Sequence, residues 1–476
     1  MGRISDDQLA QLLRGWETTR GTKAEQIAGA ILEVVRAQEI SFGSALPAER
    51  AAASALGVSR ATVADAYGIL KEQGVLQSLQ GSGWRVHRPN VDSTKENRDR
   101  IEPERSLDGF AERPTSEATS GPIINLSSGA LPGLALVARE WKNIELELID
   151  QAFEGDGYEP RGMPRLREEI ARRYTLSGRT TDADEILITS GSQQALEIIS
   201  RAWIDDGDPV VVEDPTYRGA LDAFRSRGAR LYTVPMEPNG LDVSALERIA
   251  RHTAPRFVYT LPVSHNPTGI NTSSEKLKAI SAIATERGLM IVEDMSTADL
   301  ALTEEIAPLP LHHAIDAPMT ITIGSMSKLF WGGLRIGWIR GPKPVIARFQ
   351  RHKVAMDLGT SIPSQTLALQ LLPHTTAARQ ERLETLRKSL KLAEYEITSR
   401  FPYWSWTEPS GGSGLWVRAP GVNMQEIART ALRAGVRLTP GPSFSAVGAF
   451  DDYLRLPFWS ADSVKTGLER LAAVIK

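Results

Sequence analysis

The sequence predicts an α/β protein preceded by a small helical domain, and three observations support this. From Ile123 onward, short β-branched segments alternate with segments of helical period, which is typical of an α/β domain with a mainly parallel sheet. Residues 22–87 show helical patterns that end in two short apolar segments around glycines. Between these regions, residues 88–122 are rich in Asp, Glu, Arg, Ser and Pro, which predicts a flexible linker. We therefore expect a first domain at 22–87 and a second at 123–476.

Composition narrows the class of protein. The chain has 476 residues, of which 41% are hydrophobic and 24% charged, and this is typical of a globular protein with more than one domain. It contains neither an apolar run long enough to span a bilayer nor a basic and apolar leader, so we expect a cytoplasmic protein without a membrane partner. With no cysteine and seven scattered histidines, we expect no disulfide and no metal site. A net charge of -3 indicates that any DNA binding requires a local site.

The first domain has the pattern of three helices and a hairpin. Thr22 and Glu25 have the spacing of a capping box, which predicts a helix start. Two further helices are predicted at 47–56 and 59–72, with a glycine between them. A glycine-tipped hairpin is predicted at 75–86. Two helices joined by a tight turn and followed by a hairpin form a winged helix-turn-helix, which reads DNA with its second helix.

The residues of this domain resemble the GntR superfamily of bacterial regulators. The resemblance is carried by A-L-P-A-E-R at 45–50, G-V-S-R-A-T-V-A-D-A-Y at 57–67 and G-S-G at 81–83. It implies contacts to double-stranded DNA by arginine forks, which bridge guanine acceptors or phosphates, and by hydroxyl groups. The implied residues are Arg50, Ser59, Arg60 and Thr62. The alternative is a winged helix that serves only dimerisation or protein contacts, because the domain is nearly charge-balanced.

In the second domain, one segment carries the clearest chemistry. It begins with a β-branched run that predicts a buried strand, followed by Ser325, Ser327 and Lys328 and, after two glycines, by Arg335. A lysine that is desolvated near other cations loses its proton readily and can form a Schiff base with an aldehyde. The hydroxyls and the guanidinium could hold a dianionic phosphate. The alternative is a glycine-rich turn with a solvated lysine.

Further motifs follow other predicted strands. Gly191, Ser192 and Gln193 stand at a strand-to-helix turn, where free backbone N–H groups form an anion site. Tyr217 follows the next strand and could stack on a flat heterocycle, or it could simply fill the end of the sheet. Each of these signals is weak when taken alone.

The order of the motifs resembles the fold-type I aminotransferases, which use pyridoxal 5′-phosphate (PLP). The motifs are G-S-Q-Q-A-L, E-D-P-T-Y, H-N-P-T-G, E-D and S-x-S-K, and the resemblance runs from about residue 123 to the C-terminus. It implies a large, mainly parallel sheet domain with a smaller C-terminal α+β domain. It also implies that Lys328 is the catalytic residue that forms the Schiff base with PLP.

The same resemblance assigns roles to other residues. Asn266 is expected to hydrogen-bond the phenolic oxygen of PLP. Asp294 is expected to pair with the pyridine nitrogen, with Glu293 as the second choice and a helix N-cap as the alternative for either acid. Tyr158 is expected to reach the phosphate of the partner subunit. Arg455 is expected to bind the α-carboxylate of a substrate or effector, and its alternative is a surface arginine on a late strand.

One departure from the family affects the expected activity. Relatives usually carry a tyrosine two or three residues after the aspartate, whereas Asp294-Met295-Ser296-Thr297 contains none. This departure affects the expected catalytic turnover more than the expected binding of PLP.

The fusion of the two domains resembles the MocR-type regulators. The implied protein is a homodimeric, DNA-binding transcriptional regulator that binds PLP and responds to PLP or to an amino acid or amine effector. A second reading is an active PLP-dependent aminotransferase with a DNA-binding head. A third is a dimer scaffold without a cofactor.

Overall fold

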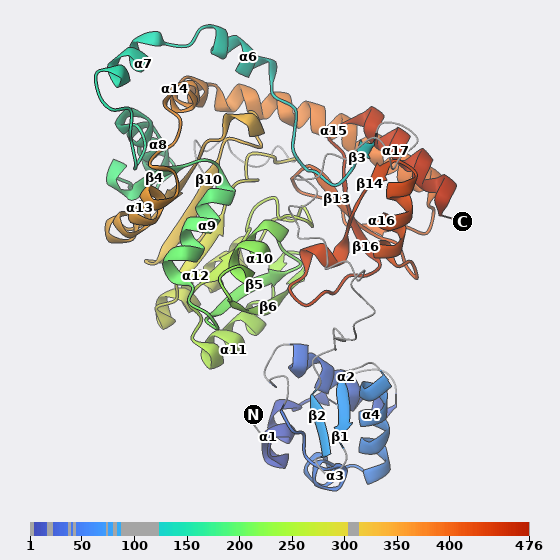
Figure 1. Ribbon diagram of the computed structural model, residues 1–476. Coiled ribbons are helices and arrows are strands. Elements are labelled where there is room, and N and C mark those ends of the chain that lie inside the picture. The colour runs from blue at the N-terminus through green and yellow to red at the C-terminus, as the bar shows by residue number, and fades with distance from the viewer. Residues whose placement is uncertain are drawn as a thin grey trace, which may run out of the picture. The chain divides into compact units, whose positions relative to one another are not determined.

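The computed structural model describes residues 4–16, 22–36, 40, 44–72, 75–79, 83–86, 123–302 and 314–475. The chain divides into two compact units, one within Met1–Glu102 and one within Pro103–Lys476 (Figure 1). The predicted linker, residues 88–122, lies outside the described residues. Among the helices that are described, none is both long enough and apolar enough to cross a membrane.

The first unit consists of helices around one apolar core, followed by a hairpin. The predicted capping box is present, because Thr22 N donates to Glu25 Oε2 at 2.7 Å and Glu25 N donates to Thr22 Oγ1 at 3.3 Å. The core also takes in Leu9 and Leu13, so the packed unit includes residues before the predicted range 22–87. Its elements are α1 Asp6–Leu12, α2 Lys23–Arg36, α3 Glu49–Leu56, α4 Arg60–Glu72, β1 Leu76–Leu79 and β2 Gly83–Val86.

Helix α3 starts later than predicted. The sequence indicated a start at Pro47, but α3 begins at Glu49 after an extended Ala48. The preceding residues are held in an extended conformation, since Leu46 N donates to Trp84 O at 2.9 Å. In addition, the Tyr67 hydroxyl donates to Pro47 O at 3.2 Å. Tertiary hydrogen bonds therefore override the preference of proline for a first helical turn.

The second unit contains an eight-stranded sheet that is mainly parallel, as predicted (Figure 1). β11 runs antiparallel to both of its neighbours, and the edge strand β7 runs antiparallel to β6. The strands in spatial order are β4 Ile186–Thr189, β11 Gly337–Arg340, β10 Thr320–Ser325, β9 Ile291–Asp294, β8 Val258–Thr260, β5 Pro209–Asp214, β6 Arg230–Glu237 and β7 Gly240–Leu241.

Helices cover both faces of this sheet because its apolar residues alternate in direction. Val210 and Val212 pack in one core with α9, α10 and α13, whereas Val211 packs in another with α11 and α12. A third core joins β4 and β11 to α8 and α14. The helices are α6 Ala135–Lys142, α7 Leu146–Phe153, α8 Pro164–Leu176, α9 Ser192–Trp203, α10 Arg218–Arg225, α11 Val243–Thr253, α12 Ser274–Arg287, α13 Lys343–Asp357 and α14 Ile362–Leu371.

The smaller C-terminal α+β part was also predicted. Its antiparallel sheet, in the order β12-β13-β16-β15, packs with α15, α16 and α17 around one core. The first strand of the second unit, β3, pairs in parallel with β14 and so joins this part rather than the large sheet. The elements are β3 Ile124–Asn125, α15 Thr375–Arg400, β12 Ser405–Trp406, β13 Gly414–Arg418, α16 Met424–Arg433, β14 Val436–Arg437, β15 Thr439–Pro440, β16 Tyr453–Pro457 and α17 Ala461–Val474.

Candidate functional site

A pocket in the second unit brings together residues that are far apart in sequence. Lys328 follows β10, Asn266 lies in the turn after β8, and Arg455 lies on β16 of the C-terminal part. The carboxyl ends of parallel strands meet at one edge of a sheet, so residues that follow them converge. The pocket is lined by Ser264, His265, Asn266, Pro267, Gly269, Thr297, Lys328, Gly412, Ser413, Gly414 and Arg455.

The amine of Lys328 is poised to lose its proton. Its Nζ donates to Gly129 O at 2.8 Å. Burial and, to a smaller extent, the positive charges of Arg455 and Arg218 lower the pKa of Lys328 to about 7, while the Asp294 carboxylate opposes this shift. A substantial part of the amine is therefore neutral near pH 7, as a nucleophile requires.

Arg455 is a pocket residue and not a surface arginine. Its side chain is 9% exposed, and burial followed by the charge of Arg218 lowers its pKa to about 10. A Cβ added to Gly129 would lie 1.9 Å from Arg455 Nη2, so the loop at 129 can approach only as glycine. Gly129 O also accepts a hydrogen bond from Ser413 Oγ at 3.2 Å. Sequence reasoning did not identify Gly129 or Ser413, although both stand in loops of small residues.

The two adjacent acids at the end of β9 point in opposite directions, because successive strand residues alternate in face. Asp294 Oδ2 accepts from the Tyr259 hydroxyl at 2.9 Å, and its Oδ1 accepts from Ser296 N at 2.9 Å. Burial raises the pKa of Asp294, and the nearby Glu213 carboxylate raises it further. The charge of Asp294 also raises the pKa of the Lys328 amine, so Asp294 belongs to the pocket side of the sheet. Tyr259 is a further residue that the sequence did not single out.

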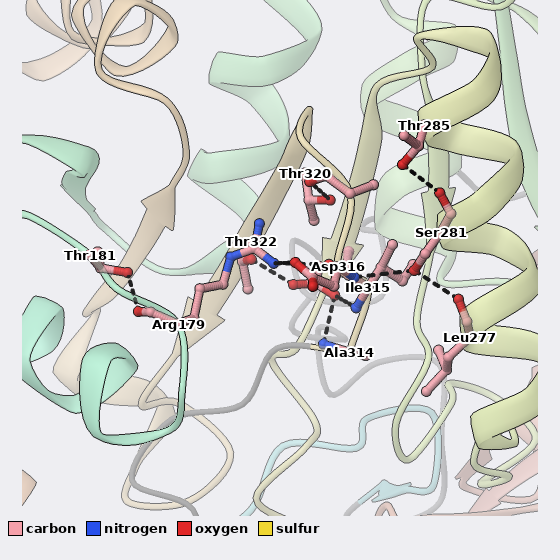
Figure 2. Close-up of polar contacts among 12 residues, drawn as sticks. Arg179, Thr181, Leu277, Ser281, Thr285, Ala314, Ile315, Asp316, Thr320 and Thr322 are labelled. Atoms are coloured by element: carbon pink, nitrogen blue, oxygen red, sulfur yellow. Dashed lines mark hydrogen bonds and ion pairs between the residues drawn. The ribbon is translucent and has the colours of Figure 1, made fainter.

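Glu293 instead anchors a backbone segment on the other face. Its Oε1 accepts from Thr322 Oγ1 at 2.6 Å, and its Oε2 accepts from the amides of Ala314 and Ile315, each at 2.9 Å. Figure 2 shows this segment between Arg179 and Ser281, and Arg179 Nη1 donates to Ile315 O at 3.1 Å. Both oxygens of Glu293 are thus occupied within the fold, one by Thr322 of the neighbouring strand and one by residues 314 and 315, which favours Asp294 for the role at a heterocycle nitrogen.

The predicted phosphate-binding residues also converge. Gly191 has a φ of 95° and precedes α9, which begins at Ser192, so the amides of a helix N-terminus are presented there. Arg335 reaches this turn, where its Nη2 donates to Ser190 O. A Cβ on Gly191 would lie 2.9 Å from that same nitrogen. Ser325 at the end of β10 pairs in register with Gly337, whose own Cα approaches Gly191. Together these groups bring a guanidinium and the first amides of α9 to one turn, and this group of residues is called the cup below.

An ion pair between Lys353 and Asp357 helps to hold the turn at Ser190. The Lys353 side chain is fully buried, and its Nζ lies 2.7 Å from Asp357 Oδ1. Asp357 Oδ2 accepts from Gln194 Nε2 at 2.6 Å, and Gln194 Oε1 in turn accepts from Ser190 N at 2.7 Å. The turn at 190 is thus held at its amide by Gln194 and at its carbonyl by Arg335. Nothing in the sequence pattern had indicated Lys353 or Asp357.

Asp357→Asn is expected to destabilise the protein and to loosen the cup. It leaves a buried ammonium group without its counter-ion, which costs about 2–3 kcal/mol of the free energy of unfolding. The control is the double variant Lys353→Met with Asp357→Leu, which should recover most of that stability but still leave Gln194 unanchored. Chemical denaturation measures the stability, and titration with PLP, the ligand that the resemblance in sequence implies, measures the effect on the cup. Recovery of PLP affinity together with stability in the double variant would refute the role of Asp357 in positioning the turn.

The remaining predicted residues take different positions. Asn266 Oδ1 is buried and has no hydrogen-bond partner among the described residues, so its amide is available to a ligand. Tyr217 donates its hydroxyl to Gln193 Oε1 at 3.1 Å at the start of α9. Tyr158 is 59% exposed, which leaves its ring free to reach another subunit. Thr297, three residues after Asp294, donates its hydroxyl to Val263 O at 3.2 Å.

In the first unit, the four predicted DNA-contact residues lie on α3 and at the start of α4. Arg50 and Arg60 are exposed. Ser59 caps α4, since Thr62 N donates to Ser59 Oγ at 3.1 Å, and the two hydroxyls lie 2.8 Å apart. Arg60 forms an ion pair with Glu49 at 3.2 Å, with the arginine side chain 73% exposed. Together, α3 and the start of α4 therefore present two cations and two hydroxyls.

Comparison with known protein families agrees with both units. Residues 121–475 match the model of aminotransferase class I and II, which is three quarters of the chain. The chain belongs to this family. Residues 23–86 match the model of bacterial regulatory proteins of the gntR family. Together with the relatives below, this shows a DNA-binding transcriptional regulator of the MocR type.

Individual relatives include both full-length regulators and enzymes. The regulator is 30% identical over 474 residues to the uncharacterized HTH-type transcriptional regulator YdfD of Bacillus subtilis, covering 95% of this chain and 96% of that protein. It is 34% identical over 303 residues to 2-aminoadipate transaminase of Thermus thermophilus, covering 62% of this chain and 76% of that protein. In structure it resembles the α-aminoadipate aminotransferase LysN of Thermus thermophilus, complexed with N-(5'-phosphopyridoxyl)-L-leucine, with a TM-score of 0.66, 29% identity, and coverage of 77% and 96%.

Proposed function

We propose that this cytoplasmic regulator binds PLP through Lys328 and an amino compound through Arg455, and that the bound state alters its binding to promoter DNA. The observation that carries the proposal is that Lys328, Asn266 and Arg455 line one pocket, with the Asp294 carboxylate near enough to act on the Lys328 amine. The test is the affinity of the full chain for its own promoter fragment, measured with and without PLP and with a series of amino acids. An affinity that does not respond to any of them would contradict the proposal.

The residues present fit PLP as the ligand. The amides of Gly191, Ser192 and Gln193, with Ser325, Ser327 and Arg335, would hold its phosphate. Asn266 has a free buried amide oxygen, and Tyr217 stands beside the α9 terminus. When bound, PLP supplies an aldehyde for an amine and an electron-withdrawing ring. Asp294 would accept a hydrogen bond from the ring nitrogen, and Lys328 Nζ would hold or release a proton beside Gly129 O.

Arg455 supports a carboxylate-bearing effector. Its guanidinium is a planar donor fork that matches a carboxylate, and it lies in the same pocket as Lys328. Burial strengthens such a contact because competing water is excluded. An amino acid would thus be held by its carboxylate while its amine lies near Lys328.

An aminotransferase is the second candidate function, and the lowered pKa of Lys328 favours it. Against it, the hydroxyl of Thr297 is engaged with Val263 O and does not replace the tyrosine of relatives. The two functions are distinguished by counting turnovers. A transaminase converts many equivalents of amino donor per chain, whereas a sensor stops after at most one.

We further propose that the regulator is a homodimer. Several large apolar side chains of the second unit are exposed, namely Trp141 at 52%, Leu146 at 63%, Tyr158 at 59%, Trp331 at 45% and Leu358 at 46%. Exposed apolar groups of this size are typical of surfaces that another subunit covers. Light scattering combined with size-exclusion chromatography tests this, and a monomer at micromolar concentration would contradict it.

The pKa of Lys328 predicts the pH dependence of its reactivity. Below its pKa the amine is protonated and unreactive, so labelling by an amine-specific reagent should rise through about pH 7 and then level off. Arg455→Met should shift this midpoint upward and Asp294→Asn downward, since these residues lower and raise the pKa of Lys328, respectively. Mass spectrometry of labelled peptides measures it.

An internal control for this titration is Lys343. Its hydrogen bond to Asp182 raises its pKa above the ordinary value, so it should be labelled only at much higher pH. If Lys328 and Lys343 were labelled with the same pH profile, the altered pKa of Lys328 would be excluded.

A further inference from the structure

One carboxylate in the first unit joins three elements of the DNA-reading domain. Glu49, the first residue of α3, uses Oε2 to accept from both Nε and Nη2 of Arg60, each at 3.2 Å. Its other oxygen, Oε1, accepts from Trp84 Nε1 at 3.2 Å. The start of α3, the start of the recognition helix α4 and the wing strand β2 therefore meet on a single side chain.

The core holds Trp84 in place. Its ring packs edge-on against Tyr67, with centroids 5.7 Å apart, and Tyr67 is fully buried. Leu46 N donates to the carbonyl of Trp84 at 2.9 Å, which joins β2 to the segment that precedes α3. The direction of the indole N–H is thus fixed. It holds Glu49 by Oε1, the carboxylate oxygen that Arg60 does not contact.

This contact leaves part of Arg60 available to DNA. Glu49 occupies the side edge of the guanidinium formed by Nε and Nη2. Nη1 donates to no described residue, so the end edge formed by Nη1 and the second N–H of Nη2 is open. The end edge carries two parallel donors, which is the arrangement that pairs with O6 and N7 of guanine. Arg60 can therefore read a base while its bond to Glu49 is intact.

The ion pair between Arg60 and Glu49 matters more for DNA binding than for the stability of the fold. Arg60 is 73% exposed, and an exposed ion pair of this kind adds little to folding. A free arginine would lose rotamer freedom on binding, and it would also bind phosphates of any sequence. An arginine that is already oriented and neutralised loses less entropy and is less attracted to unrelated DNA.

We propose that Glu49, held by Trp84, is a specificity-determining residue that positions Arg60 for base reading and suppresses its binding to DNA of unrelated sequence. The inference goes beyond DNA binding as such, because it concerns discrimination between sequences.

The test compares two duplex probes with the full-length chain. One is a duplex that the unmodified chain selects from a random pool, and the other is the unselected pool. Glu49→Gln keeps the size of the side chain but removes the charge. It is expected to bind the pool about threefold more tightly and the selected duplex about threefold less tightly, so that discrimination falls roughly tenfold. Fluorescence anisotropy at fixed salt measures both affinities.

Two further variants separate positioning from net charge. Asp65→Asn removes an exposed acid from the recognition helix α4, where Asp65 makes no hydrogen bond or ion pair with a described residue. It should preserve discrimination. Trp84→Phe keeps an aromatic ring against Tyr67 but removes the N–H that holds Glu49, so it should lower discrimination about threefold. Thermal unfolding of each variant verifies that the domain is folded.

The outcomes are distinct. Loss of discrimination in Glu49→Gln and Trp84→Phe, but not in Asp65→Asn, supports the inference. The inference would be overturned if Glu49→Gln changed the affinity for both duplexes by the same factor and Asp65→Asn had an effect of the same size. That result would show an effect of net charge only. An unmodified chain that selects no duplex over the pool would also overturn it, since there would be no base reading to position.

Discussion

Lys328→Ala is expected to abolish covalent attachment of PLP and to weaken PLP binding roughly 100-fold, or about 2.7 kcal/mol. The phosphate cup at Gly191, Ser192 and Arg335 remains, so some non-covalent affinity should persist. The amine, however, is the group whose pKa of about 7 makes it reactive in this pocket. Borohydride reduction followed by peptide mass spectrometry measures attachment, and absorbance titration measures affinity.

The matched control for this variant is Lys343→Ala. Lys343 is an exposed lysine that is paired with Asp182, and its loss should leave attachment at Lys328 unchanged. Attachment that persists in Lys328→Ala at another lysine would contradict the assignment of Lys328. The absence of PLP binding in the unmodified chain would instead refute the proposed cofactor.

Arg60→Ala is expected to weaken binding to a selected duplex by about 1–3 kcal/mol, which is roughly 5- to 150-fold. Arg60 stands at the first position of α4 and presents an exposed guanidinium. Binding to DNA of random sequence should fall less, and the salt dependence should decrease by about one phosphate contact. Anisotropy titrations at several salt concentrations measure these effects.

The control for charge alone is Arg14→Ala. Arg14 is exposed in the same unit, just after α1, and lies on neither α3 nor α4. Its removal should change the affinity for both duplexes only slightly and by similar factors. If Arg14→Ala and Arg60→Ala had the same effect on the selected duplex, base reading by Arg60 would be excluded.

Much of the fold could be predicted because its signals are local. The capping box of Thr22 and Glu25 and the glycine before the recognition helix act over a few residues, and both are present in the structure. The strands at 186–189 and 291–294 are buried on both faces, and each begins with the apolar residues that indicate a buried strand. The start of α3 was predicted wrongly because the hydrogen bonds that hold the residues before it, from Leu46 N to Trp84 O and from the Tyr67 hydroxyl to Pro47 O, join positions that are far apart in sequence.

The supporting residues of the site could not be predicted. Gly129, Tyr259 and Asp357 belong to no motif, and each acts through a partner that is distant in sequence. Asp357, for example, serves the turn at 190 through Gln194, and no spacing rule connects positions so far apart. The same holds for Glu49, whose neighbours Arg60 and Trp84 become adjacent only when the hairpin folds back.

The sequence by itself determined the order of the two domains, the alternation of strands and helices, and the motifs that place Lys328, Asn266 and Asp294 after strands. These features depend on short-range preferences and on periodic burial, both of which are written into consecutive residues. Only the tertiary structure decided that Asp294 rather than Glu293 lies on the pocket side, that Arg455 is buried beside Lys328, and that Glu49 holds Arg60. The reason is that direction, burial and pairing depend on which distant segments pack together.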